Sequence, residues 1–128
     1  MHRFASPAGI PEAKTVCTVE EIAGLRGALN EVYCDEKVGD YILDIVFKTR
    51  ERNEMIQNGA SPRATLSLNL AARGNALMHG RAYATPQDVK EVVHDVLRHR
   101  ILLTYEAEAE NVTSDIIIDK ILSTIPVP

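Results

Sequence analysis

The 128-residue sequence lacks tryptophan, and its two phenylalanines and four tyrosines bring aromatic residues to only 5%. An interior with so few rings must be filled by Ile, Leu, Val and Ala, which suits packed helices better than a sheet sandwich. Long apolar runs are missing too, since no stretch approaches the roughly 20 residues of a membrane-spanning helix. Residues 1–14 hold no apolar segment, so they do not predict a secretory signal.

Cysteine and positive charge are also scarce. Cys17 and Cys34 cannot form a disulfide framework or a four-ligand zinc site by themselves. The net charge of −4 has the wrong sign for a domain that binds nucleic acid through phosphates. The hydrophobic share of 45% and the charged share of 25% are ordinary for a globular domain. We therefore expect one soluble, reduced, cytoplasmic domain without nucleic-acid binding or membrane insertion.

Motifs for nucleotide, metal and nucleophilic chemistry are absent. The sequence has neither G-x-x-x-x-G-K-[ST] nor G-x-G-x-x-G, the glycine loops that cradle phosphates. His94 and His99 are five residues apart and so leave one helical face, and no H-E-x-x-H or C-x-x-C accompanies them. The sequence predicts no nucleotide site of its own, no metal site and no catalytic residues within the chain.

Capping residues and apolar periodicity predict an all-α bundle of about five helices. Thr18 with Glu21 forms a capping box, and Asp35, Thr85 and Thr113 stand at later helix starts. The expected helices run over residues 18 to about 33, 35 to about 50, 61 to about 79, 85 to about 97, and 113 to about 125. A short extended piece is expected within 101–105, and the alternating glutamates 106, 108 and 110 suggest a loop. Residues 1–17 predict a linker or arm before a helical domain of 18–128.

The third helix contains an unusual charge. Ser61 is expected at the cap, Pro62 at the first helical position and Gly80 just past the end. Apolar residues on most sides of this helix suggest that it is the buried centre of the bundle. Arg63 in the first turn is unfavourable by about 0.3–1 kcal/mol, because a helix N-terminus is itself partly positive. An arginine there suits the docking of an anion, and a plain surface arginine is the open alternative.

Four segments in order and in register resemble the MoxR-type AAA+ ATPases, over residues 18–128. They are V-Y-C-D-E-K-V at 32–38, G-A-S-P-R-A at 59–64, Y-A-T-P-Q-D-V at 83–89 and V-L-R-H-R-I-L-L-T-Y-E-A-E-A-E at 96–110. The resemblance implies the C-terminal helical lid alone, because the P-loop and the other motifs of the ATPase core are absent. The chain would then be a fragment, with residues 1–17 as a hinge or an added start.

The resemblance also implies roles and partners. In this family the sensor-2 arginine reaches the γ-phosphate of ATP held by the core, and that role carries onto Arg63, supported by Ser61 and Pro62. ATP and Mg²⁺ would belong to the full-length parent, an ATP hydrolase, and the fragment alone would bind neither. Implied partners are the parent's own AAA+ core, neighbouring subunits of a ring and a von Willebrand factor A domain protein. The implied work is chaperone-like remodelling or cofactor insertion.

Two points stay open at the level of the sequence. The matched segment 98–100, Arg-His-Arg, has no implied role, and cations that suit the end of a helix are the structural interpretation. A free-standing helical protein-interaction module, in which Arg63 would be idle, is one alternative to the MoxR-type lid. The lid of a magnesium-chelatase-type ATPase is the other.

Overall fold

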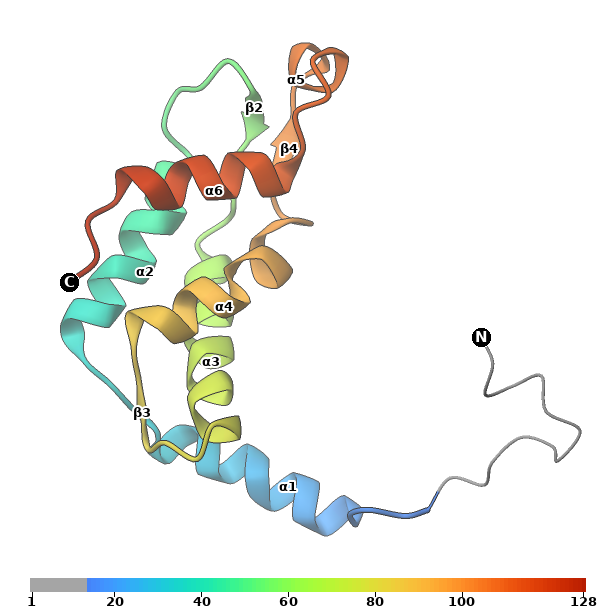
Figure 1. Ribbon diagram of the computed structural model, residues 1–128, viewed down its shortest axis with the longest axis vertical. Helices are drawn as coiled ribbons and strands as arrows, with labels where there is room; N and C mark the ends of the chain where they lie inside the picture. Colours follow the sequence, from blue (N-terminus) through green and yellow to red (C-terminus); the bar gives the residue numbers. More distant parts are fainter. Residues whose placement is uncertain (1–13) are drawn as a thin grey trace, which may run out of the picture.

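The computed structural model describes residues 14–128, and helices dominate it (Figure 1). This confirms the all-α prediction. The proposed arm of residues 1–17 lies mostly outside the described residues. The helices are α1 (Val19–Ala28), α2 (Glu36–Lys48), α3 (Arg63–Met78), α4 (Pro86–Leu97), α5 (Tyr105–Ala109) and α6 (Ser114–Thr124), with a 3₁₀ turn η1 (Leu29–Glu31). The strands are β1 (Tyr33–Cys34), β2 (Ile56–Asn58), β3 (Tyr83–Ala84) and β4 (Leu102–Leu103).

Local capping sets most helix boundaries, as expected. The Thr18 hydroxyl accepts from the Glu21 amide while the Glu21 carboxylate accepts from the Thr18 amide, which completes the capping box of α1. Thr85 forms a second capping box with Asp88 at the start of α4, whereas the side-chain oxygens of Asp35 and Thr113 accept one amide each at the starts of α2 and α6. At the other end of α3, Gly80 has φ of 70°, a left-handed conformation that glycine adopts without strain.

The C-terminal half contains one more helix than expected. The expected extended piece is present as β4, but Glu106 and Glu108 lie in the short helix α5 and not in a loop. The Thr104 hydroxyl accepts from the amide of Ala107, and Ala107 is fully buried. The Thr104 cap and the buried Ala107 side chain stabilise this short helix. Neither was recognised in the sequence, because the alternating glutamates suggested a loop. The first helix is also shorter than expected, since η1 and β1 follow it before residue 35.

The core forms where α3 packs against α2 and α4, with α6 crossing both of these helices (Figure 1). Its fully buried side chains are aliphatic and include Ile42, Ile45, Leu68, Val93 and Ile118. The expectation for α3 is only partly correct. One side of the helix fills the core, but Leu66 and Leu70 on another side are 73% and 51% exposed.

Two short ladders tie the connecting segments together. Parallel pairing of β1 with β3 joins the segments before α2 and α4, and antiparallel pairing of β2 with β4 joins the segments before α3 and α5. α1 buries no residue and lies at one end of the molecule, beside an apolar groove that it lines together with α3 and α4 (Figure 1). Within residues 14–128, no helix is long and apolar enough to cross a bilayer.

Candidate functional site

The segment that leads into α3 is fixed against the end of α2. The Thr49 hydroxyl donates to the Val46 carbonyl at 2.7 Å and accepts from the Ala60 amide at 3.0 Å, and Thr49 and Ala60 are both fully buried. A Cβ on Gly59 would overlap the carbonyl of Thr49, so the backbones can approach this closely only at a glycine. The start of α3 is therefore held by tertiary contacts.

Arg63 is the first residue of α3 and its side chain is exposed. Among the described residues it has no ion-pair partner and no side-chain hydrogen bond. The following residue, Ala64, is fully buried and anchors the turn. The structure thus places an unpaired guanidinium on the surface beside the amides of the first helical turn, where no acidic side chain offsets it.

The expected cap at Ser61 is wrong. Pro62 occupies the cap position with helical dihedral angles, and no side chain caps the helix. The Ser61 backbone carbonyl accepts from the Ala64 amide at 2.8 Å, which opens the helix with a tighter, three-residue turn. The contacts of Gly59 and Ala60 with α2 set the path of the backbone here, and the Ser61 hydroxyl makes no capping hydrogen bond.

The Arg-His-Arg segment after α4 divides into different environments. Arg98 donates to Asp95 at 2.9 Å and to Asp115 at 3.0 Å, and the hydrogen bond to Asp115 is the main cause that raises the pKa of Arg98. His99 is exposed. The side chain of Arg100 contacts α3, where its Nη2 donates to the Ser67 hydroxyl at 3.4 Å. The expected role of helix-end cations fits Arg98, which ties α4 to α6.

A polar cluster near the C-terminal end of α3 was missed by sequence reasoning. Asp88 on α4 is fully buried. Its carboxylate accepts two hydrogen bonds from the Arg81 guanidinium, at 2.6 and 2.7 Å. It also accepts hydrogen bonds from the amide and hydroxyl of Thr85 and from the side-chain amide of Asn75. The hydrogen bonds from Arg81 are the main reason that the pKa of Asp88 falls far below its usual range. The capping box of Thr85 and Asp88 is visible in the sequence, but the partnership with Arg81 is not.

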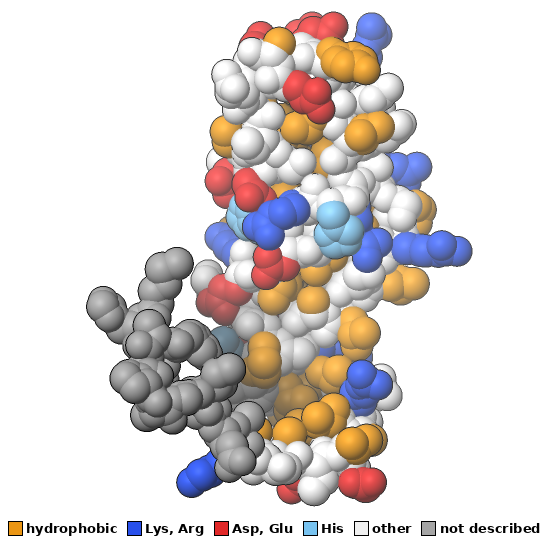
Figure 2. Space-filling view, turned by 90° about the vertical axis from the view of Figure 1, so that its right-hand side faces the viewer, with side chains coloured by type: hydrophobic (Ala, Val, Ile, Leu, Met, Phe, Trp, Pro, Cys, Tyr) orange, Lys and Arg blue, Asp and Glu red, His pale blue; other side chains and the backbone are white. Residues whose placement is uncertain are grey.

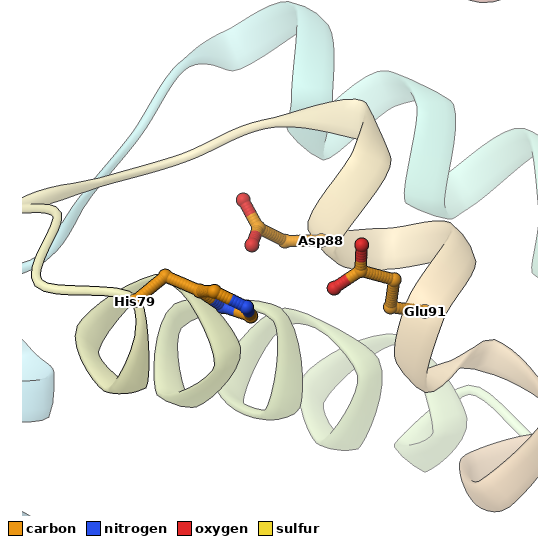
Figure 3. A group of neighbouring side chains, drawn as sticks. All are labelled: His79, Asp88 and Glu91. Atoms are coloured by element: carbon orange, nitrogen blue, oxygen red, sulfur yellow. The ribbon is translucent and has the colours of Figure 1, made fainter.

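His79, Asp88 and Glu91 bring possible metal ligands together in this cluster (Figure 3), with one ligand atom from each within 4.8 Å of the others. Both Asp88 oxygens already accept from Arg81, and Glu91 accepts from Asn75 at 2.6 Å. A cation would have to sit beside a guanidinium and displace these donors. The cluster therefore fits a structural network between α3 and α4 better than a metal centre.

Comparison with known proteins identifies the family of this domain. Residues 49–121 match the family model described as "AAA lid domain", which is more than half of the chain. The chain belongs to the AAA lid domain family. The matched range of this lid includes Thr49, Arg63, Asp88 and Arg100, so both the fixed start of α3 and the buried network lie within it.

Relatives of this AAA lid include MoxR proteins. The chain is 38% identical over 126 residues to "Chaperone MoxR1" of Mycobacterium tuberculosis, which covers 92% of the chain and 33% of that protein. It is 34% identical over 119 residues to the protein YeaC of Bacillus subtilis, and this match covers 93% of the chain and 37% of that protein. The structure matches a crystal structure of a candidate ATPase from Cytophaga hutchinsonii with a TM-score of 0.90 and 32% identity, covering 100% of this chain and 41% of that one.

These matches confirm the resemblance to MoxR-type lids. The chain spans about a third to two fifths of the length of these relatives. The similarity therefore establishes what kind of domain this is, whereas catalysis, client and assembly concern the longer proteins.

Proposed function

We propose that this chain is the nucleotide-sensing lid of a MoxR-type AAA+ ATPase. The observation that carries the proposal is the position of Arg63, an exposed and unpaired guanidinium in the first turn of a helix whose start is fixed against α2. A cation placed so can stabilise negative charge on a phosphoryl group without first breaking a contact of its own. The helix amides beside it favour the same ligand.

ATP and Mg²⁺ would be held by a core outside this chain, with Arg63 as the contribution of the lid. Its guanidinium would bind the γ-phosphate in the ATP state and lose that contact after hydrolysis. This difference in binding can bias the position of the lid, since a ligand shifts a conformational equilibrium by its differential affinity for the two states. Lid movement would then drive chaperone-like remodelling or cofactor insertion in a ring.

The test is an ATPase chimaera in which this chain replaces the matching third of Mycobacterium tuberculosis MoxR1. Arg63→Ala should lower kcat for ATP roughly 10²-fold, the scale on which one preorganised donor to a transition state acts. Arg73→Ala, which removes the same charge from the same helix about 15 Å along its axis, should leave kcat within about two-fold. An unchanged rate in the Arg63→Ala chimaera would remove the sensing role.

The apolar groove beside α1 supports contact with a second protein surface. It is lined by Ile22, Leu25 and Leu29 from one side and by Leu77, Val92 and Val96 from the other. Apolar grooves of this kind are typical of protein contacts. A parent ATPase and a free-standing interaction module both call for such a contact, so the Arg63→Ala measurement separates the two functions and the groove does not.

A further inference from the structure

Arg100 lies beside the helix that carries Arg63, although 37 positions separate the two residues in the sequence. Its Nη2 reaches the hydroxyl of Ser67, which stands four residues after Arg63 and therefore on the same face of α3. Four residues of helix rise by about 6 Å. The backbone position of Arg63 and the point where Arg100 touches α3 thus lie on one face of this helix, about a single helical turn apart.

The contacts of Arg100 leave most of its hydrogen-bonding capacity unused. A guanidinium has five N–H donors, and the long bond to Ser67 is the one side-chain hydrogen bond of Arg100 within residues 14–128. Its Nε is buried and has no acceptor, a feature that it shares with Arg73, which lies ten residues after Arg63 on α3. Burial at Nε orients the side chain through packing, while no carboxylate among the described residues neutralises its charge.

The neighbouring Arg98 shows what a structural arginine looks like in this segment. Arg98 forms ion pairs with Asp115 and Asp95, and these raise its pKa. Arg100 has no such partner in the described part of the chain, yet it is the less exposed of the two. Lysine, arginine and histidine side chains lie at mid-height on the face drawn in Figure 2, with acidic side chains among them.

We propose that Arg100 is a second lid contact to the polyphosphate chain of the nucleotide, acting beside Arg63. This inference rests on the proposed function, and it adds a residue to which neither the family match nor the sensor motif assigns a role. The residues fit such a ligand because two guanidinium groups without a carboxylate partner in residues 14–128 and the amides of the first turn of α3 lie along one face of that helix. A polyphosphate offers several anionic oxygens along its length, which suits cations spaced by a helical turn.

The arrangement also favours a triphosphate over a single phosphate. One phosphate group engages one guanidinium well, whereas a chain of three can engage both at once. The second contact is then intramolecular and costs less ordering than a separate binding event. Because Arg100 is oriented by packing, the cost of ordering its side chain is already met in the free lid.

The test uses the 128-residue chain itself and inorganic triphosphate as the probe. Nitrogen-15 NMR would follow the Nε–Hε resonances of the arginines during titration at low and constant ionic strength, because salt screens such contacts. Arg63 and Arg100 should shift together with one dissociation constant, and Arg73 should not move. Inorganic monophosphate should bind more weakly and move the two resonances less.

Variants make the test quantitative. Arg100→Ala should weaken triphosphate binding about three- to ten-fold, which is the scale of one lost charge-assisted contact at a partly exposed site. Arg100→Lys should recover part of the loss, and Arg73→Ala should bind like the parent. Circular dichroism would check that each variant keeps its helices.

The outcomes separate this inference from the proposed function. If Arg63 shifts while Arg100 stays still, or if Arg100→Ala binds triphosphate as tightly as the parent, the second contact is wrong and the role of Arg63 stands. If neither resonance moves, the two-arginine surface is wrong, and the sensing role is decided by the ATPase rate of the Arg63→Ala chimaera alone. Joint shifts with an unchanged chimaera rate would keep the anion surface and remove the sensing role.

Discussion

Asp88→Asn should cost this lid about 3 kcal/mol of unfolding free energy. The substitution keeps the shape of the side chain and removes its charge, so no cavity is created. Asp88 has a side chain only 1% exposed and faces the Arg81 guanidinium, which is 29% exposed. Breaking a buried pair by changing one partner costs about 3–5 kcal/mol, and the partial exposure of Arg81 places the cost at the lower end.

Urea unfolding followed by circular dichroism at about pH 7 measures this cost as a lower midpoint with an unchanged slope. Asp119→Asn is the matched control, since Asp119 pairs with His94 at 2.9 Å but is 70% exposed. Its cost should stay below about 1 kcal/mol, as expected of exposed pairs. A loss below about 0.5 kcal/mol for Asp88→Asn would refute the view that this pair is buried and strongly coupled.

Acid should remove the same stabilisation from the unchanged protein. The pKa of Asp88 is lower in the folded state than in the unfolded chain, where it is about 3.9. The contribution is therefore complete above about pH 5, begins to fall near pH 4 and continues to fall as pH approaches the folded value. Asp88→Asn should lose less stability than the parent between about pH 4 and pH 2. If the unfolding free energies of the two proteins fell equally over this pH range, the lowered pKa of Asp88 would be contradicted.

Three further results are expected. Gly59→Ala should destabilise the lid by about 2–4 kcal/mol in urea unfolding, because its Cβ would overlap the Thr49 backbone, whereas Gly39→Ala, with open space around it in α2, should stabilise by about 0.5–1 kcal/mol. Leu68→Ala should cost about 2–5 kcal/mol by leaving a cavity, and Leu66→Ala on the exposed side of the same helix under about 1 kcal/mol. The purified chain should show no ATP turnover in a phosphate-release assay, and turnover that persists in Arg63→Ala would contradict a lid without a core.

Local signals allowed much of the fold to be predicted from the sequence. A cap acts over three residues and an apolar stripe repeats every three or four, so helix starts can be predicted from nearby residues alone. This was the case at Thr18, Asp35, Thr85 and Thr113. Gly80 marks the end of α3 for the same reason. The resemblance to MoxR-type lids likewise depends on short segments, and it gave a role to Arg63, whose charge at a helix start is already unusual.

Features that join distant segments could not be predicted in this way. Thr49 reaches Ala60, Arg81 reaches Asp88 and Arg100 reaches Ser67, and no periodicity reports such partners. The error at Ser61 has the same origin, because tertiary contacts of the preceding residues override a favourable local cap. The candidate site was therefore predicted at its motif residue and missed at Arg100, whose place beside Ser67 depends on the packing of distant segments.

The contacts around the start of α3 limit how the proposed nucleotide sensing could work in this domain. Arg63 follows a segment whose amide at Ala60 is bonded to a buried hydroxyl on α2 and whose Gly59 touches the α2 backbone. Local displacement of Arg63 would break a buried hydrogen bond, at a cost of about 1–3 kcal/mol, before any helix moved. A pull on the guanidinium is thus transmitted to α2 and α3 together. These two helices and α4 share one core, so under the proposed sensing role the lid should move as a rigid body, with the hinge outside the bundle.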